Sequence, residues 1–363
     1  MILRILTAAA LALGGTSPAV AGPWCDAALK AAPLFAACAE APGGVALSAT
    51  QEEARRLAAV SGEAEAHFAQ FFGSPPPRYA VGHTAGASDL TGLKAAGFAV
   101  VMPWLTDAAL RRSLDESIER AFVVRAERLN LDERTAEAAL AAALRDQRVK
   151  FDAQAATRDG GLQHEMGHQW FSELFWPGSR QGPPRGRGHY GSPGPDWLDE
   201  TSALLMEPGL LADTRRDSFK KIYRGKPDTP ALQAHTVAEL VDLTHFLSQN
   251  HPIGKDRVKQ LPASAKPVAG LQVIALSAAE AAQLGYDKAA LFYFQGRMFA
   301  DFLVERTGKP AVFARISAAF ARNETMDQWL AAEGKDWGLP ASVAALDGEW
   351  RQWLMKRFGP AAA

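Results

Sequence analysis

The segment GLQHEMGHQW, residues 161–170, places two of the chain's eight histidines four positions apart, with a glutamate directly after the first. Apolar residues around it recur at every fourth position until Pro177 interrupts the pattern. This spacing predicts one amphipathic helix that ends near Pro177, because side chains four residues apart share a helix face. The apolar ladder consists of Leu162, Met166, Trp170 and Leu174, with Phe171 and Phe175 beside it.

The two histidines, His164 and His168, can bind one metal ion from the same face of this helix. Glu165, one position further along, can reach a water molecule on that ion and accept its proton, since bound zinc lowers the pKa of water to about 7. The HExxH pattern therefore predicts zinc-assisted hydrolysis with Glu165 as the general base. The alternative is a buried helix whose two histidines are satisfied by ordinary hydrogen bonds.

A third metal ligand is expected downstream, because a catalytic zinc takes three protein ligands and keeps one position open. The segment PDWLDETSALLME, residues 195–207, offers carboxylates at the start of an apolar helical stretch. Glu200 is the preferred ligand, with Asp199 and His189 as alternatives. A carboxylate that opens a helix is also stabilised by the helix dipole without any metal.

Upstream of the histidines, the pattern alternates between helix and strand. Residues 51–72 have helical apolar spacing, and RYAVGH (78–83) and GFAVVMPW (97–104) are typical of short strands. Residues 107–148 again have a helical pattern, in which Asn130 is expected to cap the second half. A small sheet is therefore expected before the histidine helix.

Downstream, a Gly, Pro and Arg-rich surface loop over residues 177–196 leads into a mainly helical half. Three capping-box patterns support these helices. The expected fold class is α+β, with a small mixed sheet packed on the HExxH helix and followed by a mainly α-helical lobe. Residues 49–360 are expected to form this single two-lobed unit. The capping boxes are Thr236 with Glu239, Ser277 with Glu280, and Thr325 with Gln328.

The amino-terminal residues 1–21 are typical of a secretory signal, with cleavage expected after Ala21. The following segment, residues 22–48, contains both cysteines of the chain, Cys25 and Cys38. In an oxidising compartment these can form a disulfide, although two buried free thiols are the alternative. We therefore expect a periplasmic or secreted protein.

The formal net charge of −1 and the absence of a long basic run argue against a nucleic-acid partner. No stretch of about 18 uninterrupted apolar residues is present, so no membrane span is expected. The oligomeric state has no signature in the sequence.

These motifs resemble those of the gluzincin metallopeptidases, in particular the aminopeptidase N and leukotriene-hydrolase family and its shorter single-domain relatives. The family motif HExxHxWF matches HEMGHQWF, residues 164–171, and the second motif, WLNEGFA, resembles WLDETSA, residues 197–203. The resemblance implies a zincin-like fold, one Zn²⁺ held by His164, His168 and Glu200, and Glu165 as the general base.

A third family element carries a tyrosine whose hydroxyl stabilises the oxyanion of the tetrahedral intermediate. The best match is YFQG, residues 293–296, which makes Tyr293 the expected donor and Tyr286 the runner-up. A core aromatic residue on an amphipathic helix is the alternative interpretation of Tyr293.

The chain departs from the family pattern at several positions. The gap of 31 residues between His168 and Glu200 is longer than the family's, and the 177–196 loop accounts for the excess. Thr201 replaces the glycine after the ligand glutamate, and no GxMEN-like motif precedes the histidines. In the family that motif binds the free amino terminus of the substrate, so exopeptidase activity is not expected.

The function expected from the sequence is that of an exported zinc metallopeptidase acting on a peptide or protein substrate. The alternatives are a catalytically silent zincin-fold protein of the cell envelope and a hydrolase of non-peptide amides or esters. Arginines in the long loop could pair with a substrate carboxylate or could simply be solvated. These arginines are Arg180, Arg185 and Arg187.

Overall fold

A computed structural model describes residues 22–86, 89–179, 192–233, 235–253 and 285–362. Several features expected from the sequence lie outside these ranges. They are the signal segment 1–21, the capping box at Ser277, and the loop residues His189, Arg180, Arg185 and Arg187.

The described residues form a four-stranded mixed sheet in the order β1-β2-β3-β4. β1 and β2 are an antiparallel hairpin, and β3 and β4 follow in parallel, with Val45 opposite Ala80 and Ala80 opposite Val101. The two strands expected from the sequence, β3 and β4, are present, whereas β1 and β2 were not anticipated in the 22–48 segment. The strands are β1 (Ala37–Ala41), β2 (Gly44–Ser48), β3 (Tyr79–Thr84) and β4 (Val100–Leu105).

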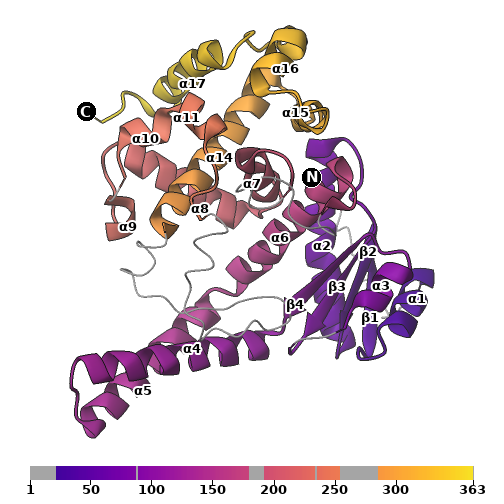
Figure 1. The fold of residues 1–363 in the computed structure, drawn as a ribbon, viewed down its shortest axis with the longest axis vertical. Helices are drawn as coiled ribbons and strands as arrows, with labels where there is room; N and C mark the ends of the chain where they lie inside the picture. The colour runs from indigo at the N-terminus through magenta and orange to yellow at the C-terminus, as the bar shows by residue number, and fades with distance from the viewer. Residues whose placement is uncertain (1–21, 87–88, 180–191, 234, 254–284, 363) are drawn as a thin grey trace, which may run out of the picture.

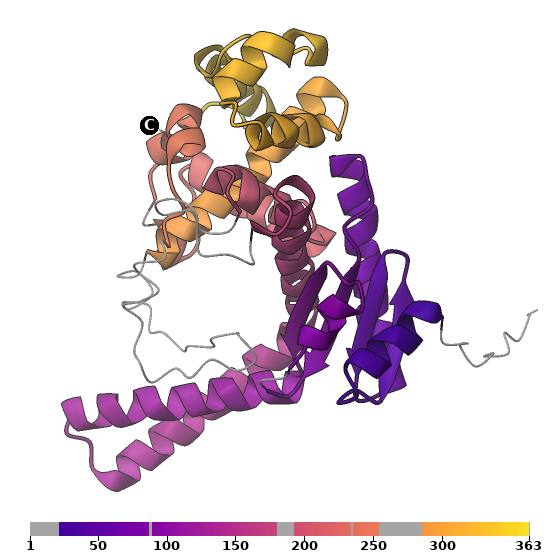
Figure 2. The same ribbon diagram turned by 45° about the vertical axis from the view of Figure 1, so that its right-hand side comes forward.

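Helices cover both faces of the sheet (Figures 1 and 2). Alternate strand residues point to opposite sides, so each strand contributes side chains to the core on either face. Val45, Leu47 and Ala80 join a core cluster with residues of α1 (Pro23–Ala31) and α3 (Thr91–Ala95). Ala46, Tyr79 and Val81 join the main core on the other face, with α2 (Gln51–Phe72) and α6 (Ala155–Phe175). A disulfide between Cys25 and Cys38 ties α1 to β1.

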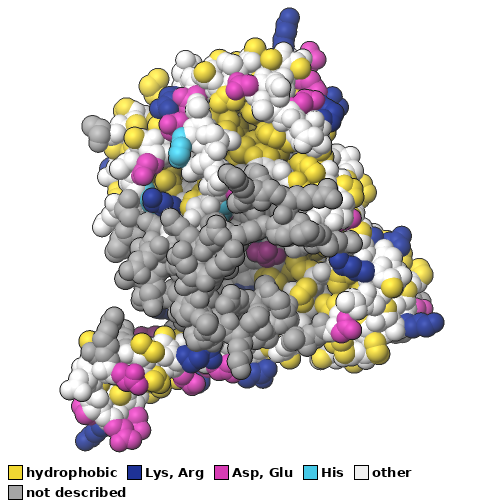
Figure 3. Space-filling model, viewed as in Figure 1, with side chains coloured by type: hydrophobic (Ala, Val, Ile, Leu, Met, Phe, Trp, Pro, Cys, Tyr) yellow, Lys and Arg dark blue, Asp and Glu magenta, His cyan; other side chains and the backbone are white. Residues whose placement is uncertain are grey.

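A helical hairpin, α4 (Asp107–Arg128) and α5 (Glu133–Ala153), projects from the body as an arm (Figures 1 and 2). Its outer end presents acidic, basic and apolar side chains together (Figure 3). The expectation that Asn130 caps α5 was wrong. Asp132 is the N-cap and accepts a 3.0 Å hydrogen bond from the Thr135 amide. Asn130 instead has a φ of 50°, a left-handed turn conformation that asparagine tolerates better than most residues.

The histidine helix α6 is anchored to the sheet side of the molecule. Leu162, Met166 and Trp170 of its apolar ladder are buried, and Leu174 is partly buried. Trp170 packs against Tyr79 of β3 with ring centroids 4.9 Å apart. Near its start, Arg158 donates to Asp107 at the base of the arm, and Asp159 pairs with Arg56 of α2. These contacts hold the first turn of α6 and its second half, and they fix which face of the helix is buried and which face carries the histidines.

The remaining described chain forms a helical lobe above α6 (Figure 1). The capping boxes at Thr236 and Thr325 are present as expected. Trp350 of α17 is buried and donates from Nε1 to the carbonyl of Val241 at 3.2 Å. None of the helices in the described ranges has the length and apolarity needed to cross a bilayer. The lobe contains α7 (Asp196–Leu204), α8 (Gly209–Tyr223), α9 (Pro230–Gln233), α10 (Val237–Val241), α11 (Leu243–Ser248), α14 (Tyr286–Thr307), α15 (Val312–Ala321), α16 (Met326–Glu333), the short 3₁₀ helix η2 (Gly334–Trp337) and α17 (Val343–Phe358).

Candidate metal centre

The site forms where α7 lies between α6 and α14. Two glycines allow the close approach of these helices. A Cβ at Gly167 of α6 would lie 2.7 Å from Cα of Ala203 and 3.0 Å from the carbonyl oxygen of Ser202. A Cβ at Gly296 of α14 would lie 2.9 Å from Cδ1 of Leu204. Both glycines belong to the short motifs that carry the site, so those motifs specify helix packing as well as chemistry.

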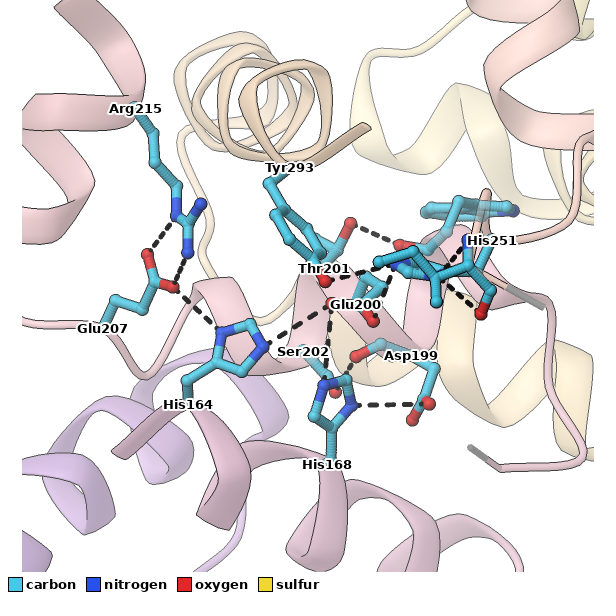
Figure 4. Close-up of polar contacts among 12 residues, drawn as sticks. His164, His168, Asp199, Glu200, Thr201, Ser202, Glu207, Arg215, His251 and Tyr293 are labelled. Carbon is cyan, nitrogen blue, oxygen red and sulfur yellow. Dashed lines mark hydrogen bonds and ion pairs between the residues drawn. The ribbon is translucent and has the colours of Figure 1, made fainter. Parts of the chain in front are cut away.

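His164, His168 and Glu200 converge at the contact between α6 and α7 (Figure 4). The Nε2 atoms of both histidines lie 3.6 Å from Oε2 of Glu200, and one potential ligand atom from each residue lies within 4.8 Å of the others. Tetrahedral zinc with ordinary zinc–nitrogen and zinc–oxygen bonds separates its ligand atoms by about 3.4 Å. These three residues can therefore hold a metal ion with small side-chain adjustments.

The Glu200 carboxylate supports this interpretation. The side chain is buried, and neither oxygen accepts a hydrogen bond from the described residues. A buried carboxylate without hydrogen bonds is costly unless a cation compensates it. The donor set of two imidazoles and one carboxylate, with further positions open, is one that catalytic zinc commonly takes.

The outer nitrogens of both histidines face carboxylates. Nδ1 of His164 lies 2.9 Å from Oε1 of Glu207, and Nδ1 of His168 lies 3.4 Å from Oδ2 of Asp199. Such partners orient the ring so that Nε2 is presented to a metal. Asp199, an alternative third ligand from the sequence, thus lies on the outer side of His168, while Glu200 joins the ligand atoms.

Glu207 is itself held by Arg215 of α8. Nε of Arg215 lies 2.6 Å from Oε2 of Glu207, and its NH2 group contacts Oε1. The same guanidinium carbon lies 5.0 Å from the ring centroid of Tyr293. Arg215 therefore connects the support of His164 to the tyrosine on α14.

Tyr293 lies beside the ligand cluster, with its ring centroid 6.0 Å from that of His164. Its hydroxyl is 3.2 Å from Nε2 of His251, and that nitrogen is 3.5 Å from Oε1 of Glu200. The sequence-predicted oxyanion donor is therefore placed next to the predicted ligands. The side chain of Tyr286, the runner-up, lies outside the described part of the chain.

Glu165 is exposed on α6, unlike the buried Glu200. At 3.6 residues per turn, it lies about 100° round the helix from His164 and about 60° from His168. Its carboxylate is thus next to the ligand face and in contact with solvent.

The charges of this cluster are strongly coupled. Burial alone lowers the pKa of His164, but its contacts with Glu200 and Glu207 raise it to about 10. Burial raises the pKa of Glu207, but Arg215 and His164 bring it down to about 2. Burial likewise raises the pKa of Glu200, and the charges of His168 and His164 outweigh it and lower the pKa. Without a metal, protons on the histidines therefore balance the buried carboxylates.

Sequence reasoning missed three residues of the site: Glu207, Arg215 and His251. Glu207 lies beyond the end of α7 at Leu204, so helical spacing from Glu200 offers no signal for it. Arg215 and His251 offer none, because they reach the site from α8 and from the chain after α11, through contacts distant in sequence.

Comparisons of this chain with protein-family models, curated proteins and solved structures gave no significant match. The geometry of the site is therefore the basis for its functional interpretation.

Proposed function

We propose that this chain is an exported zinc metallopeptidase of the gluzincin type, with a zincin-like fold, which hydrolyses peptide bonds. The observation that carries the proposal is the convergence of His164, His168 and Glu200, with Tyr293 beside them and Glu165 exposed on the same helix. Three short motifs, separated in sequence, meet at one point.

Zinc, when bound by these three ligands, supplies Lewis-acid polarisation of the scissile carbonyl and a lowered pKa for water. Glu207 and Asp199 hold the outer ring nitrogens, so the histidines need little reorganisation when they bind the ion. The fit of the residues to zinc rests on the donor set and on the buried Glu200 oxygens, which accept no hydrogen bond from the described residues.

The roles of the residues follow from their positions. Glu165 accepts a proton from the attacking water, and the oxygen of that water bonds to the carbonyl carbon. Tyr293 donates its hydroxyl hydrogen to the oxygen on which negative charge develops. Glu165 then delivers its proton to the amide nitrogen as the carbon–nitrogen bond breaks, leaving a carboxylate and an amine.

A peptide substrate is supported by the position of β4. It is the last strand in the order of the described sheet, and it packs against α6 in the main core. An extended peptide can add to such an edge through backbone hydrogen bonds. A strand edge beside the metal helix favours a peptide over a small non-peptide ester.

The test is cleavage profiling of a peptide library with the mature, zinc-loaded protein, its Glu165→Gln variant and a Glu137→Gln control. Glu137 is exposed on the arm, so its substitution should leave cleavage unchanged. Cleavage is expected for the wild type and the control, and is expected to be lost in Glu165→Gln while zinc remains bound. Undiminished cleavage by Glu165→Gln would exclude the general-base role, and no cleavage by the zinc-loaded wild type would contradict peptidase function.

A further inference from the structure

The contact between His251 and Tyr293 indicates a role for a histidine that has no place in the HExxH and WLDE motifs. We propose that His251 is a positioning residue that directs the hydroxyl hydrogen of Tyr293 toward the substrate oxyanion. This inference rests on the proposed peptidase function.

His251 is held firmly at this point. Its backbone amide donates a 2.7 Å hydrogen bond to Oδ2 of the buried Asp196, at the start of α7. Its side chain is fully buried and lies edge-on to Phe292, with ring centroids 5.4 Å apart. Asp196 thus anchors the backbone, independently of what the imidazole does.

The hydrogen bonds of the ring define its tautomer. The backbone amide of Ile253 donates to Nδ1 of His251 at 3.1 Å, a closer contact than that of the Ile253 carbonyl oxygen, at 3.3 Å. Because an amide nitrogen can only donate, this hydrogen bond requires Nδ1 to accept, and a neutral ring then carries its hydrogen on Nε2. His251 therefore presents an N–H group toward the tyrosine and Glu200.

That N–H group determines how the Tyr293 hydroxyl can act. Nε2 lies 3.2 Å from the hydroxyl oxygen and 3.5 Å from Oε1 of Glu200, so the closer acceptor is the hydroxyl. A phenol that accepts a hydrogen bond on its oxygen keeps its own hydrogen for another acceptor. The oxyanion that forms during hydrolysis is an acceptor of this kind, and a pre-oriented donor is most effective there.

The proposal predicts an effect on turnover more than on binding. Replacement of His251 by Leu should lower kcat about 10- to 100-fold with little change in KM, because the oxyanion exists only along the reaction. Replacement by Gln, whose amide nitrogen can reach the position of Nε2, should restore most of the loss. Replacement by Asn, whose amide reaches only the position of Nδ1, should not restore the lost turnover. The asparagine variant replaces the leucine variant in this test if the leucine variant does not fold.

The deciding experiment is a double-mutant cycle with Tyr293→Phe, together with zinc affinity measured by chelator competition. If His251 acts through Tyr293, His251→Leu will have a large effect in the wild type and almost none in Tyr293→Phe, and zinc affinity will stay within about twofold. His245→Leu is the control, because His245 is exposed on α11 and its hydrogen bonds with described residues involve only its backbone.

Two outcomes would overturn the proposal while leaving the peptidase function intact. The first is an equal loss from His251→Leu in both backgrounds, and the second is a fall in zinc affinity that accounts for the lost turnover. Either would show that His251 supports Glu200 rather than Tyr293. An inactive, zinc-loaded wild type would instead contradict the peptidase function itself, and this inference with it.

Discussion

The guanidinium of Arg215 lies 5.0 Å from the ring centroid of Tyr293 while it pairs with Glu207. Because Glu207 contacts His164 at 2.9 Å, Arg215 connects a candidate metal ligand with the candidate oxyanion donor. The connection runs through an ion pair in which Glu207 is buried and Arg215 is partly buried, so the loss of Arg215 leaves the buried carboxylate uncompensated.

Replacement of Arg215 by Met is expected to destabilise the protein by roughly 3 kcal/mol, because it leaves the Glu207 carboxylate buried without its partner. Arg215→Lys should retain part of this stability, since it keeps the charge but not the bidentate fork. Urea unfolding of the metal-free variants measures both effects. The surface arginine Arg315, paired with Glu333, is the control, and Arg315→Met should cost less than about 1 kcal/mol. Equal losses for the two methionine variants would contradict the buried-pair interpretation.

The carboxylates behind the two histidines should support metal affinity. Glu207→Gln is expected to weaken zinc binding about 10- to 100-fold, because a neutral amide orients and polarises His164 less strongly. Asp199→Asn should weaken it less, since its contact with His168 is 3.4 Å against 2.9 Å for Glu207 and His164. Chelator competition measures both, and unchanged affinity in Glu207→Gln would remove its supporting role.

The metal-free protein should lose stability toward both extremes of pH. The pKa of His164 rises from 6.5 to about 10 on folding, so its contribution is complete below pH 6.5 and disappears as the pH rises through about 10. The pKa of Glu207 falls from 4.5 to about 2, so its contribution is complete above pH 4.5 and disappears as the pH falls through about 2. The two contributions overlap fully between about pH 4.5 and 6.5.

Urea unfolding of chelator-treated protein across this range measures the effect, and Glu207→Gln should flatten the profile. Zinc affinity should change in the opposite sense to histidine protonation and rise with pH, because ligation displaces the proton held by His164. A zinc affinity that stays constant between about pH 6 and 9 would contradict this coupling between zinc binding and the loss of the His164 proton.

The spacing of α6 and α7 should be sensitive to a single methyl group. Gly167→Ala places a Cβ 2.7 Å from the Ala203 backbone, so the helices must separate. We expect a loss of roughly 1–3 kcal/mol in stability and weaker zinc binding, because His168 and Glu200 lie on the separated helices. Gly161→Ala on the same helix is the matched control, since among the described residues its Cβ would come within 4 Å of Trp104 alone, at 3.9 Å.

This control should be neutral or stabilising by up to about 1 kcal/mol, because alanine favours helix more than glycine does. Thermal unfolding and chelator competition on both variants test the prediction. Equal behaviour of Gly161→Ala and Gly167→Ala would show that the close approach at Gly167 does not control the site.

Local sequence patterns predicted those helices whose apolar spacing or capping residues lie close together in the sequence. The ladder around Trp170 predicted α6, and the capping boxes at Thr236 and Thr325 predicted two helix starts. The prediction that Asn130 is the N-cap of α5 was wrong, because asparagine and aspartate near a turn can both cap a helix. The carboxylate of Asp132 is the N-cap in the structure. β1 and β2 were missed because each strand has five residues, and the alanines of β1 and the glycine of β2 have weak strand preference, so the two strands gain their stability from pairing.

The sequence by itself determined the chemical types at the site: two imidazoles at helical spacing, carboxylates that open a second helix, and a tyrosine on a third. Only the tertiary structure decided which of these meet and what supports them. Glu207 reaches His164 across 43 positions of sequence, and Tyr293 reaches His251 across 42. Such contacts depend on how whole helices pack against one another. Buried surfaces and the close contacts of Gly167 and Gly296 with α7 establish this packing, and no local sequence pattern encodes it.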